Sequence, residues 1–320
     1  MANIKQIAEK AGVSVTTVSR VLNNHPYVSS EKKEAVLTAV EQLHYTRNIN
    51  AIHLAKGKTH LIGVVIPYTN HPYFGAIMEG ISKRANAFGY HLVIFQTHYE
   101  KDKELQALEM LKMKQLDALI ICSRINEVKT LNEYNRYGPI ILCEDSAQDT
   151  FPSISIDQYT AFSTALTYLI ERGHRKIGYS LGRKKGRNSH LRSKAYQDII
   201  REFKLETNPD WIFEGCYNMK DGVDIFNKWL HFADKPDALI ITNDQAAAGC
   251  MLAGKNAGID FPEQLAVIGF DNDEIAKQMG ITTVSLPLES MGKTAVDLFI
   301  DGNEPQQIKL DFQLIQRSSC

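Results

Sequence analysis

The chain has 320 residues, of which 44% are hydrophobic, and a formal net charge of −1. This length exceeds that of one small module and is sufficient for a second, larger domain with its own core. The longest apolar runs fall far short of the roughly 18 residues of a membrane span, and no signal-peptide pattern is present, so we expect a soluble, cytoplasmic protein. The five cysteines form no Cys-x-x-Cys pair, which favours reduced core thiols over disulfides or zinc.

Between Asn3 and Leu43 the pattern predicts three short helices, with a tight Gly-Val-Ser turn between the first two. In the first helix, apolar residues recur at i, i+3, i+4 and i+7 from Ile4, and Asn3 and Gln6 are placed as N-cap and N3 residue. The helix is expected to end at Gly12. This arrangement is a helix-turn-helix, a module whose second helix enters the major groove of DNA.

The second helix is expected to begin after a cap at Ser14. Helical spacing divides it into an inward apolar face and an outward face whose hydroxyls and guanidinium can meet base edges and phosphates. The expected inward residues are Val15, Val18 and Leu22, and the expected outward residues are Thr16, Thr17 and Arg20. A third helix follows a cap at Ser29 or Ser30, and its residues Val36, Ala39, Val40 and Leu43 are expected to close a small core.

The charge distribution supports DNA as the partner of this segment. Residues 1–60 hold eight Lys and Arg against four Glu, whereas the remainder holds 28 basic against 33 acidic residues. The near-neutral net charge of the chain is therefore the sum of a basic segment, residues 1–60 (the head), and an acidic remainder (the body). Attraction to phosphate depends on where the cations lie. The alternative is a small helical domain with a solvated charged face.

The stretch IKQIAEKAGVSVTTVSRVLNNHPYVS, followed by residues 48–59, resembles the LacI/GalR family of bacterial transcription regulators. The resemblance implies that Val15, Thr16 and Arg20 of the recognition helix contact bases and phosphates. It also implies a hinge helix over residues 48–56, which would place Asn48 among the DNA contacts.

In this family the hinge leucine wedges into a minor-groove step, and here that position is Leu54. The chain departs from the family pattern at Arg47, where proline is usual, and at Ile52, where arginine is common. About eight residues are too few to hold a helix alone in water, which takes roughly 12 to 15. We therefore expect the hinge to fold on the duplex, where paired leucines offset the cost of unstacking. A plain linker with an incidental leucine is the alternative.

From residue 61, short β-branched runs alternate with helical stretches, which predicts an α/β fold of parallel sheets covered on both faces by helices. The sequence Ile62-Gly63 returns as Ile177-Gly178, and Asp117-Ala-Leu-Ile returns as Asp237-Ala-Leu-Ile, so two similar lobes are expected. The predicted strands are LIGVVIP, YHLVIFQT, ALIICS, PIILCED, SISID, KIGYSLG, WIFEGCY, ALIITN, LAVIGFDN and TTVSLP, and the last residues, from Asp311 to Cys320, are expected to form a strand and an irregular end.

These patterns, together with the family's periplasmic-binding-protein-like body, give the expected domains. A helix-turn-helix domain takes residues 1–47, a hinge and linker take 48–60, and a two-lobed effector-binding and dimerisation body takes 61–320. Lobe one is expected at about 61–157 and 289–309, and lobe two at about 158–286 and 310–320.

Ligands of parallel sheets bind beyond the carboxyl ends of the strands, and here those ends carry polar pairs suited to sugar hydroxyls. Aromatic residues near the lobe edges can cover the apolar face of a sugar ring. Each polar residue alone has a competing structural role, because such groups also cap the helix that follows. The pairs are Ser123-Arg124, Glu144-Asp145, Gly182-Arg183, Asn243-Asp244 and Asp271-Asn272, and the aromatic residues are Tyr73, Phe74, Tyr217 and Phe270.

The family resemblance extends to this body through NHPYF from Asn70, RSKAY from Arg192, TNDQAAAG from Thr242 and VIGFDN from Val267. It implies an effector cleft, and Leu286 stands where the family often has a polar residue. Carried across position by position, the cleft would be lined by Tyr73, Phe74, Glu144 or Asp145, Arg192, Tyr217, Asn243 and Asp271.

Two short motifs suggest an enzyme, but their context argues against it. Gly178-Tyr-Ser180-Leu-Gly182 fits a nucleophile elbow, which requires a helix immediately after the serine, whereas a basic loop follows here. Gly249-x4-Gly254-Lys255 lacks the Ser or Thr of a P-loop and lies in an alanine-rich helical stretch. No histidine pair has metal-ligand spacing, so we expect no catalytic residue, metal or cofactor.

The sequence therefore predicts a homodimeric, sequence-specific DNA-binding regulator, by resemblance a repressor. Its body would sense a small molecule, most simply a sugar or sugar derivative, and its operator would be pseudo-palindromic. One alternative is a regulator switched by a protein co-regulator that docks on the body. A second is an α/β sugar-binding or hydrolytic protein whose helical head serves assembly.

Overall fold

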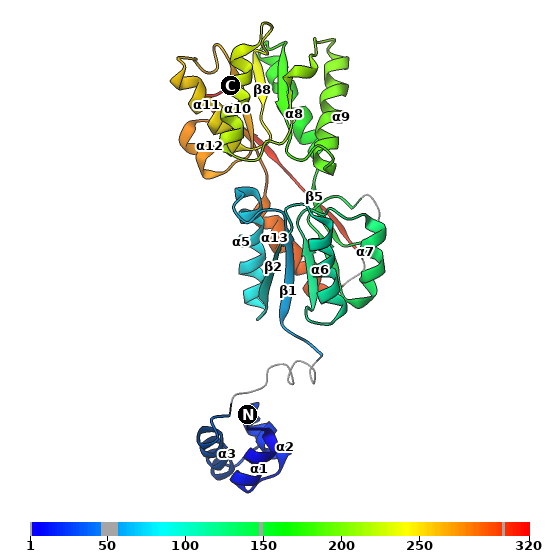
Figure 1. Cartoon of the computed structure of the whole chain (residues 1–320), viewed down its shortest axis with the longest axis vertical. Helices are drawn as coiled ribbons and strands as arrows, with labels where there is room; N and C mark the ends of the chain where they lie inside the picture. Colours follow the sequence, from blue (N-terminus) through cyan, green and yellow to red (C-terminus); the bar gives the residue numbers. More distant parts are fainter. Residues whose placement is uncertain (1, 46–56, 147–149, 303–304) are drawn as a thin grey trace. The chain divides into compact units, whose positions relative to one another are not determined.

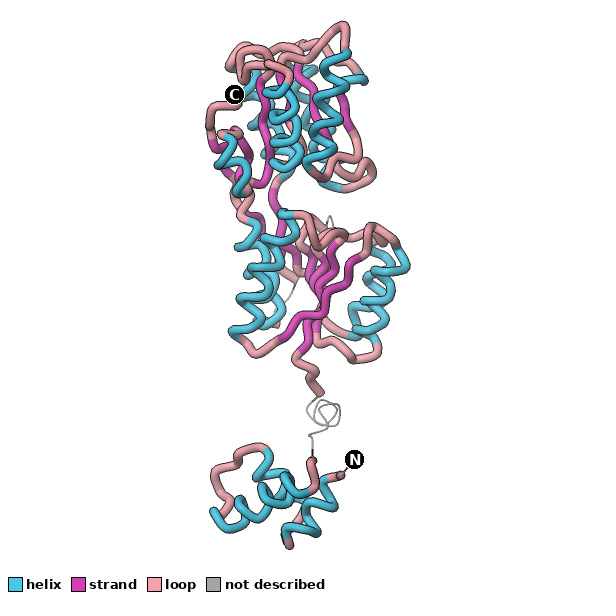
Figure 2. Tube along the Cα trace, turned by 60° about the vertical axis from the view of Figure 1, so that its left-hand side comes forward, coloured by secondary structure: helices cyan, strands magenta, loops and turns pink. Residues whose placement is uncertain are grey.

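The computed structural model describes residues 2–45, 57–146, 150–302 and 305–320. The chain forms two compact units, Met1–Thr59 and His60–Cys320, and each is described by itself. In its described residues the smaller unit contains helices and no strand, whereas the larger contains two sheets flanked by helices, as Figure 2 shows by colour.

The described part of the small unit contains helices α1 (Ile4–Ala11), α2 (Val15–Leu22) and α3 (Ser30–Gln42). The predicted capping box at the start of α1 is present, because Asn3 Oδ1 accepts from the Gln6 amide and Gln6 Oε1 accepts from the Asn3 amide. Gly12 ends α1 in the left-handed conformation, at φ 62°. The three helices enclose a core formed by Ile7, Ala8, Val18, Val21, Val36 and Ala39.

The predicted inward face of α2 is partly wrong. Val18 is buried as expected, but Val15 is 41% exposed and Leu22 is only partly buried. Val21 closes the core instead. The reason is geometric, because Val18 and Val21 are three residues apart and share the face toward α1 and α3, whereas Val15 lies in the first turn, beyond that packing.

The large unit contains two six-stranded sheets of matching order, β11-β5-β4-β3-β1-β2 in lobe one and β12-β10-β9-β8-β6-β7 in lobe two. Figure 1 shows the helices placed on both faces of these sheets. The prediction of two similar α/β lobes is therefore confirmed. The strands are parallel except for one pair, because β12 runs antiparallel to β10. β11 runs parallel to β5 and so ends at the carboxyl edge of the first sheet, and the two residues that follow lead β12 into lobe two from the carboxyl ends of its strands.

Lobe one is built mainly from the first half of this unit and receives one helix and one strand from the end of the chain. Its strands are β1 (Leu61–Ile66), β2 (His91–Gln96), β3 (Ala118–Ile121), β4 (Ile140–Leu142), β5 (Ser153–Ile156) and β11 (Gln307–Leu310). Its helices are α5 (Pro72–Ala87), α6 (Lys101–Lys112), α7 (Val128–Tyr134), the 3-10 turn Asn135–Tyr137 and α13 (Leu288–Asp301).

Lobe two takes the intervening segment and the last strand. Its strands are β6 (Ile177–Ser180), β7 (Ile212–Phe213), β8 (Ala238–Ile240), β9 (Ala266–Asp271), β10 (Thr282–Ser285) and β12 (Gln313–Ile315). Its helices are α8 (Gln158–Glu171), α9 (Arg187–Glu202), the 3-10 turn Pro209–Trp211, α10 (Met219–His231), α11 (Asp244–Asn256) and α12 (Glu274–Met279). The chain passes between the lobes after β5, after β10 and after β11, so three connections join the two lobes.

The repeated Asp-Ala-Leu-Ile motif lies at equivalent positions in the two lobes. Asp117 precedes β3, and its Oδ2 accepts from the His60 amide at 3.0 Å. Asp237 precedes β8, and its Oδ2 accepts from the Arg175 amide at 3.1 Å. In each lobe this carboxylate fixes the start of the neighbouring strand, which explains why the same Asp-Ala-Leu-Ile motif occurs twice.

Two helix pairs pack closely enough to require glycine. A Cβ on Gly292 of α13 would lie 2.0 Å from the Ile77 carbonyl oxygen of α5. A Cβ on Gly249 of α11 would lie 1.9 Å from the Met219 carbonyl oxygen of α10. Gly249 is the first glycine of the P-loop-like motif, so its presence there is explained by helix packing.

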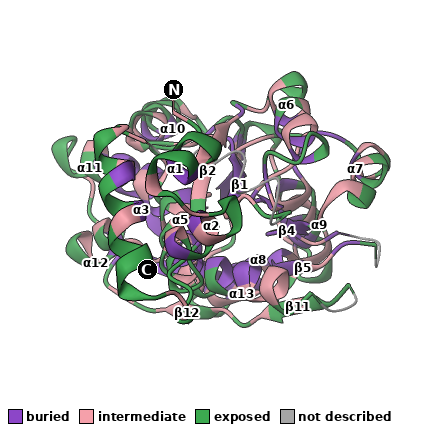
Figure 3. Cartoon of the chain, turned by 90° about the horizontal axis from the view of Figure 1, so that it is seen from below, coloured by how far each residue is buried: buried purple, intermediate pink, exposed green. Residues whose placement is uncertain are grey.

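Figure 3, coloured by burial, shows that helices α8 and α13 turn buried faces inward. All five cysteines are free and buried, as predicted for core thiols. Among the described residues, no helix combines the length and the apolar character that crossing a bilayer would take.

Candidate nucleic-acid interface and effector cleft

The exposed surface of α2 in the small unit carries most of the side chains predicted to touch DNA. Val15, Thr16 and Arg20 are exposed. Thr17 is partly buried, and its hydroxyl lies 2.9 Å from that of Ser14, whose oxygen also accepts the Thr17 amide. Thr17 therefore helps to begin the helix and offers less to a groove than the other three. The exposure of Val15 also agrees with the position that the family resemblance assigns to it.

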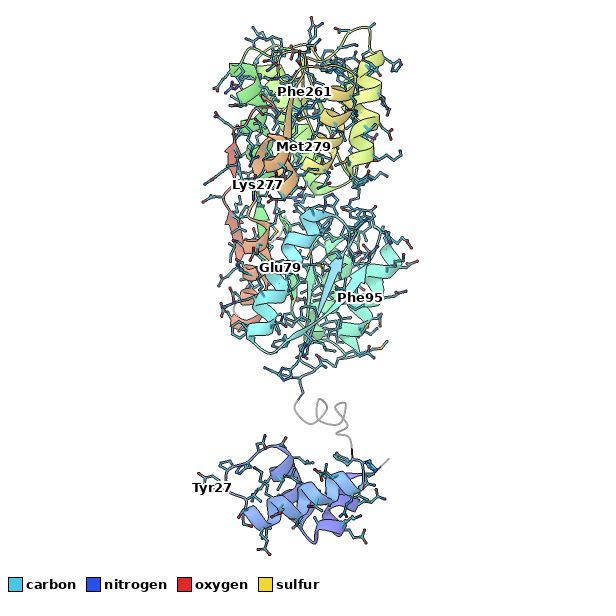
Figure 4. The ribbon with its side chains drawn as sticks, turned by 90° about the vertical axis from the view of Figure 1, so that its left-hand side faces the viewer. Tyr27, Glu79, Phe95, Phe261, Lys277 and Met279 are labelled. Carbon is cyan, nitrogen blue, oxygen red and sulfur yellow. The ribbon has the colours of Figure 1, made fainter. Side chains whose placement is uncertain are left out.

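Other parts of the small unit leave side chains on its surface. Tyr27 is 85% exposed and is labelled in Figure 4. Five of the eight basic residues of the head lie within residues 2–45, and four of these (Lys5, Lys10, Lys32 and Lys33) lie on α1 and α3. The remaining three lie at positions 47–58, so much of the basic excess belongs to the hinge segment. Asn48 and Leu54 lie outside the described residues.

A cavity lies between the two lobes of the large unit, at the carboxyl ends of the parallel strands. Seven of the eight predicted effector residues line it: Tyr73, Phe74, Glu144, Arg192, Tyr217, Asn243 and Asp271. Asp145 does not line the cavity, but it forms an ion pair across the lobes with Arg187, which does. Residues that lie far apart in the sequence are thus brought together as the strand-end argument predicts.

Arg192, on α9, is held rigidly in the cavity wall. Its Nε donates to Gln158 Oε1 at 3.0 Å and its Nη1 to the Thr242 carbonyl at 3.1 Å. The guanidinium carbon lies 4.0 Å from the ring centre of Phe270. These contacts fix a planar cation in place before any ligand arrives, although burial lowers the pKa of Arg192.

Phe270 was expected at the cleft edge, and this prediction is wrong. The residue is fully buried in β9, where one face of its ring supports Arg192. Alternation along a strand explains the result, because Asp271 faces the cavity and its predecessor points to the core.

Asp271 presents its carboxylate to the cavity from an unusual backbone conformation. Its φ is 99° and that of Asn272 is 57°, both in the left-handed region. Burial raises the pKa of Asp271 to about 7, although Arg192 opposes the shift. No described residue donates a hydrogen bond to this carboxyl, so a ligand hydroxyl is a suitable partner.

Asp244 supports the turn that carries Asp271. Its carboxyl accepts from the Asp273 amide at 2.9 Å and from the Thr283 hydroxyl at 2.7 Å. Burial raises the pKa of Asp244 to about 8. The helix cap expected at Asp271 belongs instead to Asp273, whose side chain accepts from the first amides of α12, so Asp271 is left free to face the cavity.

Asn243 and Tyr217 lie on the second-lobe side of the cavity and contact each other. Asn243 caps α11 by accepting the Ala246 amide at 2.9 Å, and its Nδ2 donates to the Tyr217 carbonyl. The Tyr217 ring lies 5.5 Å from that of Tyr68 in lobe one. Asn243 therefore has both the structural role and the cavity position that the sequence left as alternatives.

Glu144 is almost completely buried beside a cation of the same lobe. Its Oε1 lies 2.7 Å from Arg124 Nε. Burial raises the pKa of Glu144 to about 7, against the opposing effects of Arg124 and Arg183. The carboxyl can thus act as a hydrogen-bond donor or acceptor toward a ligand near neutral pH.

Sequence reasoning missed the loop between β6 and α9 as a set of cleft residues. Arg183 and Arg187 line the cavity from this loop. Arg183 Nη2 donates to the Arg124 carbonyl at 3.1 Å, and its guanidinium stacks on Tyr99 with 4.4 Å to the ring centre. The strand-end pair Gly182-Arg183 was the available signal, whereas Arg187 and Tyr99 required the three-dimensional arrangement.

In the described part of the chain, the surroundings of Ser180 differ from those of a nucleophile elbow. The Ser180 hydroxyl accepts the Thr242 amide at 2.9 Å, and six residues separate Ser180 from the start of α9. Among the described residues no cluster of three His, Cys, Asp or Glu side chains is suited to a metal ion.

Family models match both units of the chain. Residues 3–48 match the model described as bacterial regulatory proteins, lacI family. Residues 59–318 match the model described as periplasmic binding proteins and sugar binding domain of the LacI family. Together these matches extend over nearly the whole sequence.

Individual proteins give the same result. The chain is 47% identical to the uncharacterized HTH-type transcriptional regulator YkvZ of Bacillus subtilis, over the full length of both. It is 31% identical to the HTH-type transcriptional repressor PurR of Serratia proteamaculans, covering all of this chain and 97% of that one. A crystal structure of a LacI family transcriptional regulator from Lactobacillus casei with bound glucose superposes with a TM-score of 0.75 at 26% identity, covering 81% of this chain and 99% of that one.

Proposed function

The chain belongs to the LacI family of DNA-binding bacterial transcription regulators, and from this premise we propose that it is a cytoplasmic repressor whose operator affinity is set by a carbohydrate bound between its lobes. The observation that carries the proposal is the cavity itself, in which seven predicted residues converge in the same chain as a helix-turn-helix. The repressor role is supported by the relative named PurR.

We propose that α2 reads the operator. Val15 and Thr16 contact bases, and Arg20 binds phosphate or a base edge, because all three are exposed on the helix that the motif places in the major groove. Thr17 contributes chiefly by completing the cap at Ser14. A homodimer would then bind two half-sites about one helical turn apart, with Asn48 and Leu54 acting in the intervening minor groove.

The effector proposal is supported by the polarity of the cavity. Asp271 offers acceptors without a protein donor, and Arg192 and Asn243 lie in the same wall with fixed side chains. Carboxylates, amides and guanidinium groups at fixed positions suit vicinal hydroxyls, while Tyr73 and Tyr217 provide aromatic surface for a sugar ring. The matched family model is itself described by its sugar binding domain.

The mechanism follows from linkage between two sites. A ligand that prefers one arrangement of the lobes shifts the population of that arrangement by its differential affinity. If only the other arrangement allows the paired hinges to fold on DNA, the ligand weakens operator binding, typically by about 1 to 3 kcal/mol, or roughly 5- to 150-fold.

The proposal is tested by two measurements on the full-length protein. A carbohydrate library is screened by thermal shift, and each ligand that stabilises the protein is then added to a complex with its promoter DNA, followed by fluorescence anisotropy. We expect at least one sugar or sugar derivative to raise the unfolding temperature and to change operator affinity at least fivefold. A protein that binds no promoter fragment at low salt, or binds one identically with every such ligand, contradicts the proposal.

A further inference from the structure

At the end of the cleft near the β6–α9 loop, Arg183 lines the cavity without an ion pair. Arg124 is paired with Glu144 at 2.7 Å, and Arg187 is paired with Asp145. Arg183 has no carboxylate within ion-pair distance among the described residues. Arg183 is partly buried in the cavity wall, so an anionic ligand can supply the counter-ion that the described residues do not.

The two loop arginines also retain unused donors. The Nε atoms of Arg183 and Arg187 are both shielded from solvent and make no hydrogen bond within the described part of the molecule. Stacking on Tyr99 and the bond to the Arg124 carbonyl hold the plane of Arg183 fixed. A fixed planar fork with free N–H groups matches a group that has two or more anionic oxygens.

The amino-terminal end of α9 reaches the same place. Gly186, the N-cap residue, provides no side-chain cap, so the first amides of this 16-residue helix are left without an acceptor. Asn188 and Ser189 of this first turn line the cavity. Ser189 is 92% buried. Helix amino termini with free amides stabilise bound anions.

From these contacts we propose that the effector carries an anionic group, a phosphate ester or a carboxylate, that binds between Arg183, Arg187 and the first turn of α9. The sugar ring then occupies the part of the cavity lined by Arg192 and Asp271. This inference rests on the proposed function, since it specifies the chemical class of the ligand of the same cleft.

The nearby carboxylates do not oppose such a ligand strongly. Glu144 and Asp145 each have an arginine partner, which offsets their charge. Burial raises the pKa of Glu144 to about 7, so a substantial fraction of this group is uncharged at neutral pH. A third carboxylate, Glu104, interacts with Arg124 and accepts the Ile125 and Asn126 amides, so it is also occupied by groups of its own lobe.

The loop itself provides a matched control. Lys185 lies between the two arginines in the sequence, is exposed, and does not line the cavity. Lys185→Gln removes the same charge as Arg183→Gln from the same loop. Arg183→Lys keeps the charge but removes the planar fork, which separates geometry from net charge.

The experiment is isothermal titration of the full-length protein, at constant ionic strength, with neutral hexoses and disaccharides, their 6-phosphates, the matching uronic acids and inorganic phosphate. We expect a phosphorylated or carboxylated sugar to bind at least about tenfold more tightly than its neutral parent. The two anionic series identify which group the site takes. The preference should disappear in Arg183→Gln, weaken in Arg183→Lys and persist in Lys185→Gln, with unfolding temperatures checked for each variant.

Three results would overturn the inference: a neutral parent that binds as tightly as its anionic forms, a preference that survives in Arg183→Gln, or no binding of any anion in the panel. The proposed function is judged separately by operator release. A neutral sugar that binds the cleft and releases DNA leaves that function intact and removes only the anionic group. Tight binding of an anionic sugar without any effect on DNA affinity supports the anionic group and contradicts the proposed function.

Discussion

The guanidinium carbon of Arg183, in lobe two, lies 4.4 Å from the ring centre of Tyr99, in lobe one. The Tyr68 and Tyr217 rings, 5.5 Å apart, make a second contact between the lobes, and the ion pair between Arg187 and Asp145 makes a third. A ligand in the cavity therefore meets a surface on which the relative position of the lobes already depends. This relationship gives a physical route from occupancy of the cleft to the arrangement of the lobes.

Replacing Tyr99 with Leu should weaken effector binding. A cation stacked on an aromatic ring contributes about 0.5 to 2 kcal/mol, so we expect a roughly two- to thirtyfold loss of affinity, measured by titration with the ligand found in the library screen. Tyr137→Leu is the matched control. The guanidinium carbon of Arg136 lies 4.8 Å from the ring centre of Tyr137, and this pair does not line the cavity. Equal affinities in the two variants would show that the Arg183 stack is unimportant for the ligand.

Replacing Arg192 with Ala should abolish the response to the effector while operator affinity without effector is retained. The change removes the fixed cation beside Asp271 and leaves Gln158 and the Thr242 carbonyl without their donor. We also expect a lower unfolding temperature, because buried polar groups lose their partners at a cost of about 1 to 3 kcal/mol each. The measurement is anisotropy of labelled operator with and without ligand. Normal induction in this variant would remove Arg192 from the proposed site.

Replacing Arg20 with Ala should weaken operator binding by about 1 to 3 kcal/mol and reduce the salt dependence by about one phosphate contact. The exposed position of Arg20 on α2 is the reason. Operator affinity is measured at several salt concentrations between low and moderate salt. Lys228→Ala, at an exposed position of α10, is the control for the loss of one positive charge. A salt slope equal to that of the wild type would contradict a phosphate contact by Arg20.

Replacing Leu54 with Ala should reduce specific operator binding by about 1.5 to 3 kcal/mol, the value of burying a large aliphatic side chain. Effector binding and the dimer should be unaffected. The readout is DNA bending, measured by energy transfer between the ends of an operator fragment. Leu37→Ala, at an exposed position of α3, serves as the comparison. Bending that is undiminished in the Leu54 variant would rule out a wedge.

Replacing Asp244 with Asn should make stability less dependent on pH. In the unfolded chain this carboxyl ionises near pH 4, whereas in the fold burial raises its pKa to about 8. The folded state therefore binds one more proton between these values, and its contribution makes the free energy of unfolding fall as the pH rises. Urea unfolding at pH 5.5 and pH 7.5 should show a smaller fall in the variant than in the wild type. An equal fall would mean that Asp244 is ionised in the fold.

The alternation of helix and strand patterns predicted the two lobes because both periodicities are local properties of the chain. The capping box at Asn3 was predictable for the same reason, since its partners are three residues apart. Seven of the eight residues that the strand-end rule and the family resemblance predicted for an effector cleft line one cavity. The family resemblance itself is confirmed by the matches to both units.

The predictions that were wrong depended on which way a side chain faces in the assembled fold. Val15 and Phe270 satisfied the apolar pattern, yet one lies beyond the helix contact and the other supports Arg192 from within the core. Arg187 and Tyr99 could not be identified in advance, because their proximity depends on two lobes meeting. The antiparallel β12 was missed because a short strand gives no sign of its direction.

The most direct test of the account is reciprocity between the two sites. Linkage requires that an effector which weakens operator affinity by some factor is itself bound more weakly, by the same factor, when operator is present. The two affinities are measured by titration on the same full-length protein, with Arg192→Ala as the uncoupled comparison. We predict equal factors of at least five for the wild type, and an operator affinity that does not change with effector for the variant. Effector affinity that is unchanged by saturating operator would contradict the account.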